Sequence, residues 1–126
     1  MTTDTTTTAE TLVDDYFAMW LETDPDGRAR RIAAVFTDDG RHVDPNADAV
    51  GHDGLAAMMG AVHAQFPGLG MRRTSAIDAH NDQLRFAWEL LAPDGAVIVA
   101  GIDVAQLADD GRLRQVAGFW GDLPVA

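Results

Sequence analysis

The stretch GIDVAQL, residues 101–107, places an aspartate, Asp103, in a run that otherwise reads as the most apolar strand of the chain. Burying a lone carboxylate is costly unless it is paired, hydrogen-bonded or protonated. A second aspartate, Asp44, stands directly before Pro45, and Tyr16 is the single tyrosine of the sequence. Forming an enolate needs a base near the carbon and preorganised hydrogen-bond donors near the oxygen, in a dry site. A tyrosine and two aspartates are residue types suited to that chemistry.

Each of these residues also has a purely structural interpretation. Asp103 could pair with one of the nine arginines, Asp44 could start a turn, and the Tyr16 hydroxyl could bond a backbone carbonyl in the core. His42 lies two residues before Asp44, which allows a His-x-Asp metal pair, but no third ligand follows in an obvious position, so we expect no metal. The remaining histidines, expected on loops or helix surfaces, are His52, His63 and His80.

Composition removes several reaction classes. The chain of 126 residues has no cysteine and no lysine, so thiol nucleophiles, thiolate metal sites and Schiff bases are excluded. Its one serine, Ser75, lacks a G-x-S-x-G context, and no phosphate-binding or dinucleotide motif predicts a cofactor. A net charge of −11 disfavours nucleic acid as a partner. With no long apolar run and no signal-peptide pattern, we expect no membrane association and a cytoplasmic location.

Hydrophobic spacing predicts that helices precede a set of strands. A capping-box pattern at residues 7–10 marks the start of the first helix, and Asp24-Pro25 supply the N-cap and first position of the second. The elements expected in the first half are helices over about 8–23, from 25 to a stop at 38–40, and over roughly 54–65, with a short strand at 41–43. We expect residues 1–8 to be a flexible lead-in and 9–126 to form a single domain.

Apolar runs separated by turn signals dominate the second half. The predicted strands cover 71–79, 84–92, 96–107 and 112–120, and the turns HNDQ, PDG and ADDG between them favour antiparallel hairpins. Helices first and a meander afterwards predict an α+β fold, with the helices on one face of a curved, mostly antiparallel sheet.

The period of two along residues 96–107 assigns its side chains to two faces. Asp103 shares its face with Val97, Val99, Gly101 and Ala105, and the other face carries Ile98, Ala100, Ile102 and Val104. Both faces are apolar, so both should be covered. We expect the helices to cover the first face and a second copy of the chain to cover the other, which makes a homodimer.

Three stretches carry a resemblance that spans about residues 16–122. They are the aromatic-rich first helix, FTDDGRHVDP at 36–45 and GIDVAQLADDGRLRQVAGFWGD at 101–122. The chain resembles the nuclear transport factor 2-like (SnoaL-like) superfamily, whose fold is a cone, and within it is most similar to the bacterial ketosteroid (steroid Δ5) isomerases. The resemblance implies that Asp44 is the base and that Tyr16 and a protonated Asp103 are the oxyanion donors.

The resemblance also implies a substrate pocket on the concave side of the sheet. The residues expected to line it are Trp20, Met59, Phe86, Trp88, Val99, Gly101, Val116 and Trp120. Phe36 and Met59 stand where those isomerases have further tyrosines that support the catalytic one. Trp20 and Trp88 stand at positions that are small in the family, and Gly101 stands where a larger residue is usual, so the pocket shape is altered.

The function predicted is a cofactor-free enzyme that moves a proton next to a ketone on an apolar, multi-ring substrate. Alternatives on the same fold are a SnoaL-like polyketide cyclase, a dehydratase or an epoxide hydrolase, and fold alone does not separate them. A further alternative is a non-catalytic protein that binds a small ligand, in which the carboxylates are structural.

Overall fold

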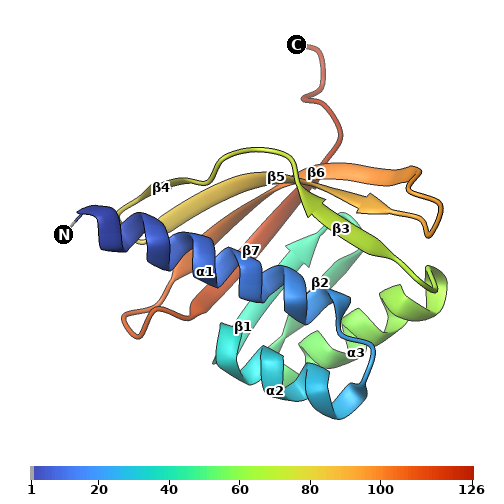
Figure 1. The fold of residues 1–126 in the computed structure, drawn as a ribbon, viewed down its shortest axis with the longest axis horizontal. Helices are drawn as coiled ribbons and strands as arrows, with labels where there is room; N and C mark the ends of the chain where they lie inside the picture. Colours follow the sequence, from blue (N-terminus) through green and yellow to red (C-terminus); the bar gives the residue numbers. More distant parts are fainter. Residues whose placement is uncertain (1) are drawn as a thin grey trace.

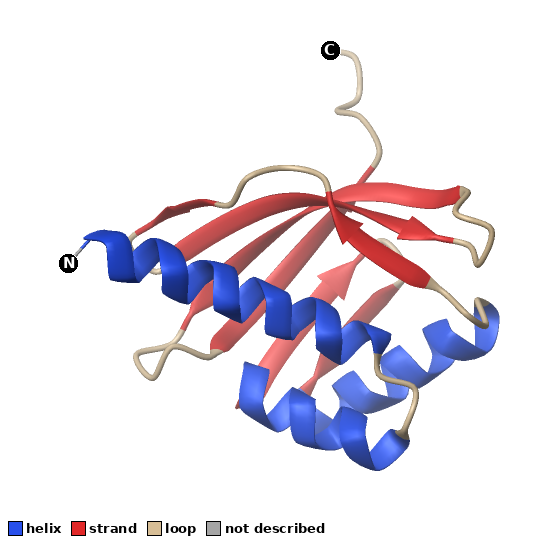
Figure 2. Ribbon diagram, in the orientation of Figure 1, coloured by secondary structure: helices blue, strands red, loops and turns tan. Residues whose placement is uncertain are grey.

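The computed structural model describes residues 2–126, with side chains from Thr8 onward. The helices are α1 (Thr2–Leu21), α2 (Pro25–Val35) and α3 (Gly51–Gln65). The strands are β1 (Phe36–Asp44), β2 (Ala47–Val50), β3 (Gly70–Arg73), β4 (Asp78–His80), β5 (Gln83–Leu91), β6 (Val97–Leu107) and β7 (Leu113–Trp120). All three helices lie on one side of a curved sheet, which confirms the predicted α+β arrangement (Figures 1 and 2).

The sheet is mixed. Its strand order is β2-β1-β7-β6-β5-β3, with β4 pairing β5 beside this path. Strands β5, β6 and β7 form the antiparallel meander that the turn signals predicted, whereas β1 runs parallel to β7. Strand β2 follows β1 in a tight hairpin, and the sequence pattern does not predict this strand. The parallel pair joins the first half of the chain to its end.

Helix α1 begins at Thr2, six residues before the start that the sequence predicts, and the capping-box pattern therefore lies inside the helix. No glycine or proline occurs between residues 2 and 9 to stop the helix from extending. Its buried face carries Val13, Tyr16, Met19 and Trp20. Tyr16 is thereby directed toward the concave side of the sheet.

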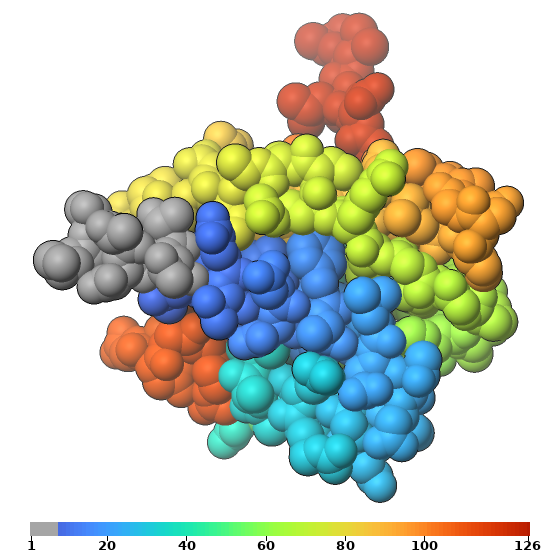
Figure 3. Space-filling model, in the orientation of Figure 1, coloured from blue at the N-terminus to red at the C-terminus, as the bar shows by residue number. Residues whose placement is uncertain are grey.

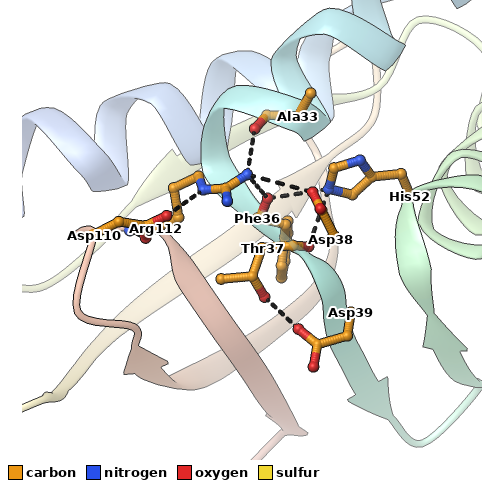
Figure 4. Close-up of polar contacts among 8 residues, drawn as sticks. All are labelled: Ala33, Phe36, Thr37, Asp38, Asp39, His52, Asp110 and Arg112. Carbon is orange, nitrogen blue, oxygen red and sulfur yellow. Dashed lines mark hydrogen bonds and ion pairs between the residues drawn. The ribbon is translucent and has the colours of Figure 1, made fainter.

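The corner between α2 and β1 explains a second difference from prediction. Asp24 caps α2 as expected, accepting a hydrogen bond from the Gly27 amide at 2.8 Å, but the helix ends at Val35 rather than at 38–40. Arg112, from the β6–β7 turn, donates to the carbonyls of Ala33 and Phe36 at 3.1 Å each (Figure 4). These bonds satisfy the last helical turn, so the chain can enter β1 at Phe36.

The histidines of α3 are half-buried tethers rather than surface residues. Nε2 of His52 contacts the carbonyls of Phe36 and Thr37 at 3.1 and 3.0 Å (Figure 4), and Nε2 of His63 contacts the carbonyl of Trp20 at 2.7 Å. A carbonyl only accepts, so each Nε2 carries its proton. His80 is exposed, as expected, but it lies in strand β4 rather than on a loop or a helix.

The two faces of β6 follow the predicted alternation over most of its length. The inward side chains are Val99, Asp103 and Ala105, and Ile102 and Val104 lie on the exposed face. A bulge changes the start of the strand, because Leu90 pairs with Val99 while Leu91 pairs with Val97. Val97 is therefore exposed, contrary to prediction, and Ile98 reaches the inner cavity.

The C-terminal residues do not pack against the core. Residues 121–126 are exposed and project away from the body of the domain (Figure 3). In the same view α1 lies between α2 and the segment that contains β3 and β4. Among the described residues no helix is long and apolar enough to cross a membrane.

Candidate functional site

A cavity of about 540 Å³ lies between the helices and the concave face of the sheet. Most of its walls are apolar side chains from α3, β3, β5 and β6. The exposed side chains of Asn46, Asp48 and Gln65 line it where it meets solvent. Its buried polar residues are Tyr16, His42, Asp103 and the half-buried Asp44. No arginine contributes to this wall among the described residues, so the cavity offers no guanidinium group to pair with an anionic ligand.

Asp103 is hydrogen-bonded rather than ion-paired. The Tyr16 hydroxyl is 2.9 Å from Oδ2 of Asp103, and the two residues are only 2% and 3% exposed. No arginine forms an ion pair with Asp103 among the described residues, so the interpretation that pairs it with a guanidinium is not supported. Tyr16 is held by the packed rings of Phe86 and Phe36, with centroids at 5.9 and 6.4 Å. A tyrosine on a helix and an aspartate in a strand thus form one buried unit.

The environment of this pair favours the neutral form of both groups. Burial raises the pKa of Asp103, and the charge of Asp44 adds to this, while His42, Tyr16 and Trp88 partly oppose it. Burial also raises the pKa of Tyr16 well above its ordinary value, and the neighbouring Asp103 raises it further. The tyrosine consequently keeps its proton at neutral pH and remains a donor.

Asp44 ends β1 at the edge of the same cavity. Its Oδ2 is 2.9 Å from Nε2 of His42, and its Oδ1 accepts the Asn46 amide at 2.8 Å, as a turn-starting aspartate does. Partial burial acts to raise the pKa of Asp44, but the hydrogen bonds from His42 and from the amides of Asn46 and Ala47 outweigh it. Its pKa is therefore lowered, and the carboxylate is ionised at neutral pH.

His42 is the polar residue whose role the sequence did not identify. It is 3% exposed and packs edge-on against Trp20, with ring centroids 5.5 Å apart. We had considered His42 and Asp44 as a metal pair, and the structure instead joins them directly by a hydrogen bond. Among the described residues no group of three or more histidine, aspartate or glutamate side chains is arranged to hold a metal ion. The signal in the sequence that could have identified this contact is the spacing of two residues between His42 and Asp44, which in a strand puts both side chains on one face.

Gly118 separates the two aspartates. A Cβ atom at this position would lie 3.0 Å from Oδ1 of Asp103 and 3.3 Å from Cβ of Asp44. A glycine inside a strand commonly marks a close approach of other groups, and this one lets both acids face the same space. Tyr16, Asp44 and Asp103, predicted from three distant segments, are therefore brought together.

The predicted lining residues divide into two groups. Trp20, Trp88, Val99 and Trp120 line the cavity. Met59, Phe86, Gly101 and Val116 do not, because they are packed in the core behind it. Helix α3 turns Leu55 and Met59 into the core, and the cavity-facing positions on this helix are Gly54, Met58, Ala61, Val62 and Gln65. The rotation of a helix whose two sides are both apolar was not readable from its sequence.

Comparison with known proteins agrees with this architecture. Three helices on a curved mixed sheet define the nuclear transport factor 2-like fold, seen also in a protein from Exiguobacterium sp. 255-15 that is 20% identical, with a TM-score of 0.70 over 89% of this chain and 99% of that one. The model of the SnoaL-like domain matches residues 13–116. The chain therefore belongs to the SnoaL-like family.

Two further solved structures are similar. A proposed isomerase of the SnoaL-like family from Agrobacterium tumefaciens strain C58 is 34% identical, with a TM-score of 0.87 over 92% of this chain and 99% of that one. A proposed SnoaL-like polyketide cyclase from Jannaschia sp. CCS1 is 18% identical, with a TM-score of 0.66 over 86% and 84% of the two chains. No curated protein matches the chain significantly.

Proposed function

We propose that this protein is a cofactor-free isomerase that moves a proton next to a ketone on an apolar, multi-ring substrate, as the ketosteroid isomerases do. The observation that carries the proposal is the buried Tyr16–Asp103 hydrogen bond of 2.9 Å in the same cavity as the ionised Asp44. A carboxylate base and neutral donors within one apolar cavity are what enolisation requires. The 34% identity to a proposed isomerase supports the same reaction class.

The proposed reaction has two proton transfers. The Asp44 carboxylate takes a proton from the carbon next to the ketone, and the electron pair of that C–H bond moves to form an enolate. The protonated Asp44 then returns the proton further along the conjugated system, which moves the double bond and regenerates the carboxylate. No oxidant, metal or second substrate takes part in this scheme, so its atoms and charges balance within the ligand and one side chain.

Asp44 is a weak base, because its hydrogen bonds lower its pKa. The enolate must therefore be stabilised from the oxygen side. The Tyr16 hydroxyl donates to Oδ2 of Asp103. A protonated Asp103 has an O–H of its own to donate to the ligand oxygen, and the bond from Tyr16 strengthens that donation.

The lining supports an uncharged substrate with several rings. Trp88, Leu90 and Val99 line the cavity beside Asp103, and Met58 and Phe66 of α3 line it too. A volume of about 540 Å³ falls in the range of drug-sized ligand pockets. An anionic ligand would meet carboxylates and no guanidinium group among the residues that line the cavity.

The test is a panel of β,γ-unsaturated ketones with one to four rings, followed by the absorbance of the conjugated product. We expect turnover that rises with ring number as the cavity fills. Exchange of the protons next to the carbonyl with deuterium, without movement of the double bond, would favour the polyketide cyclase alternative, which shares only the first proton transfer. Binding that raises the melting temperature with neither exchange nor turnover would contradict the proposal and identify a ligand-binding protein.

A further inference from the structure

Trp88 and Gly101 form an interlocking pair beside the buried acid. They are direct cross-strand neighbours on β5 and β6, and a Cβ atom at residue 101 would lie 2.7 Å from Cζ2 and 3.1 Å from Cε2 of the indole. Cε2 is the ring carbon bonded to Nε1. The nitrogen-bearing edge of the ring therefore crosses β6 at the one position where the missing side chain leaves room.

Asp103 is the next inward-facing residue along β6 after Gly101. Trp88 is thus its diagonal cross-strand neighbour, a relation that brings long aromatic side chains within reach. The indole N–H of Trp88 is buried and makes no complete hydrogen bond with any described residue. An unpartnered buried donor is costly, and the polar group beside it is the Asp103 carboxyl group.

We propose that Trp88 is a positioning residue, whose indole N–H donates to the Asp103 carboxyl group across the gap left by Gly101. A small rotation of the indole about its side-chain bonds completes this hydrogen bond in the protein by itself. In the mechanism, this donation makes the Asp103 O–H a stronger donor toward the ligand oxygen. That catalytic consequence rests on the proposed function, but the hydrogen bond itself does not.

Asp103 has polar neighbours on several elements, and the proposal must be separated from their effects. Tyr16 of α1 donates to it, and His42 and Asp44 of β1 act on it through their charges. Burial raises the pKa of Asp103, while Trp88 is among the groups that lower it. Removing the indole N–H alone should therefore raise the pKa of Asp103 without altering the other three neighbours.

The first experiment uses the wild-type protein labelled with ¹⁵N. Because the indole N–H of Trp88 donates to Asp103, its NMR signal should shift with the same midpoint as the Asp103 carboxyl carbon. Asp103→Asn should abolish that step. The matched control is the indole of Trp120, which lies opposite Gly101 on β7 and also lines the cavity but is not among the groups that shift Asp103. A Trp88 signal that ignores the Asp103 midpoint, or follows it no more than Trp120 does, overturns the proposal.

The second experiment removes the donor. Trp88→Phe keeps an aromatic ring and should move the Asp103 midpoint to higher pH, as should Gly101→Ala by displacing the indole edge, whereas Trp120→Phe should leave it in place. On any substrate that the wild type turns over, Trp88→Phe should lower kcat about 3- to 10-fold with little change in KM, which is the size of one hydrogen bond. An unchanged Asp103 midpoint in Trp88→Phe refutes the hydrogen bond whether or not the protein is an isomerase.

Discussion

The acids on the surface and the acids in the cavity are partnered in different ways. Outside, Asp48, Asp78, Glu89 and Asp110 each meet an arginine, with closest N–O distances between 2.6 and 2.9 Å. Inside, Asp44 and Asp103 have no arginine among the described residues and depend on His42, Tyr16 and backbone amides instead. The chain thus keeps its fixed positive charges away from the two acids that face the cavity.

The difference has a physical consequence for protonation. An exposed carboxylate beside a guanidinium stays ionised, and water screens the pair, so the contact contributes little. A buried carboxylate without a fixed cation has a charge state that is set by burial and by neutral donors. The same residue type is therefore ionised at Asp44 and favours the neutral form at Asp103, as the opposite directions of their pKa shifts indicate.

The largest expected effect comes from removing one cavity acid. Asp44→Asn keeps the shape of the side chain but cannot accept a proton, so kcat should fall by about 10²–10⁴-fold while ligand binding persists. Steady-state kinetics and a ligand-induced melting shift measure the two quantities. Asp78→Asn, on the surface, is the control and should leave both unchanged. Full activity in Asp44→Asn would remove this aspartate from the role of base.

The next effect concerns an acid placed at the apolar centre of the outer sheet face. We propose that the outer face of β6 and β7 binds a second copy of the chain, because Ile102 and Phe119 are paired neighbours there and are 46% and 64% exposed. The charged residues at the rim, Arg85 and Glu89, are already engaged with Asp78 and Arg72, which leaves an apolar centre. The face is self-complementary in an isologous dimer.

Ile102→Asp should convert that dimer into a monomer, because an unpaired carboxylate would be buried in the interface. Light scattering at micromolar concentration measures the mass of both proteins. Arg114→Asp, at an exposed position on the same sheet, makes an even larger negative change in charge in a different place and should remain dimeric. A wild-type protein that is already monomeric would contradict the proposed interface.

A smaller effect tests how closely the wall beside Asp103 is packed. At residue 101 a Cβ atom would lie 2.6 Å from the carbonyl oxygen of Phe119 and 2.7 Å from the Trp88 ring. Gly101→Val should therefore lower the free energy of unfolding by about 1–3 kcal/mol through overpacking. Urea denaturation measures this loss of stability. Gly95→Ala is not a suitable control, because Gly95 has a positive φ of 89° that an alanine rarely adopts. An unchanged unfolding midpoint would mean that the indole is free to move.

The pH dependence of stability separates the two cavity acids. Because the folded pKa of Asp103 is raised, its contribution to stability is complete below the unfolded pKa and is lost as pH rises through the folded pKa. Asp44, with a lowered folded pKa, contributes above its unfolded pKa and loses that contribution as pH falls through the folded value.

Asp103→Asn is neutral at every pH, so its free energy of unfolding should lack the decline on the alkaline side and exceed that of the wild type at neutral pH. Denaturation series between acid and neutral pH provide the comparison. Asp103→Leu should fold but lose the donor and hence activity. If Asp103→Asn followed the wild-type pH profile, the raised pKa of Asp103 would be refuted.

The smallest effect on stability is expected from an ion pair on the surface. Arg85 and Asp78 are both well exposed, and their contact is 2.9 Å. Arg85→Ala should leave the unfolding midpoint within experimental error, because solvent screens such a pair. Thermal denaturation at low and high salt provides the measurement. A loss as large as that in Gly101→Val would show that the surface pairs stabilise the fold and that the contrast drawn between outside and inside is too sharp.

The sequence was sufficient for the fold class and for the three residues that gather at the cavity. Asp103 and Val99 could be assigned to one face because alternation along β6 is regular, and Asp24-Pro25 marked a helix start by local chemistry alone. Three features were not predictable from the sequence. They are the bulge near Val97, the rotation of α3 that turns Met59 into the core, and strand β2. Each depends on pairing with a distant segment, which local propensity does not encode.

The polar contacts of the cavity residues were harder to predict from the sequence than the strands and helices. The sequence places His42 and Asp44 on one face, but the hydrogen bond between them depends on the distance between their side chains, which only the structure shows. Gly118 was legible as a glycine in a strand, and only the structure shows that two acids flank it. Likewise the early end of α2 is set by Arg112, which contacts Phe36 from 76 residues away in the sequence.

That long-range corner has a consequence for the order in which the chain folds. We expect strand β1 to pair with β7 late in folding, since contacts between distant segments carry the largest loop-closure cost. Asp103 lies in the meander and Asp44 on β1, so the two negative charges approach each other only when β1 docks. On this expectation, the cavity with its two acids is completed only when β1 joins the sheet.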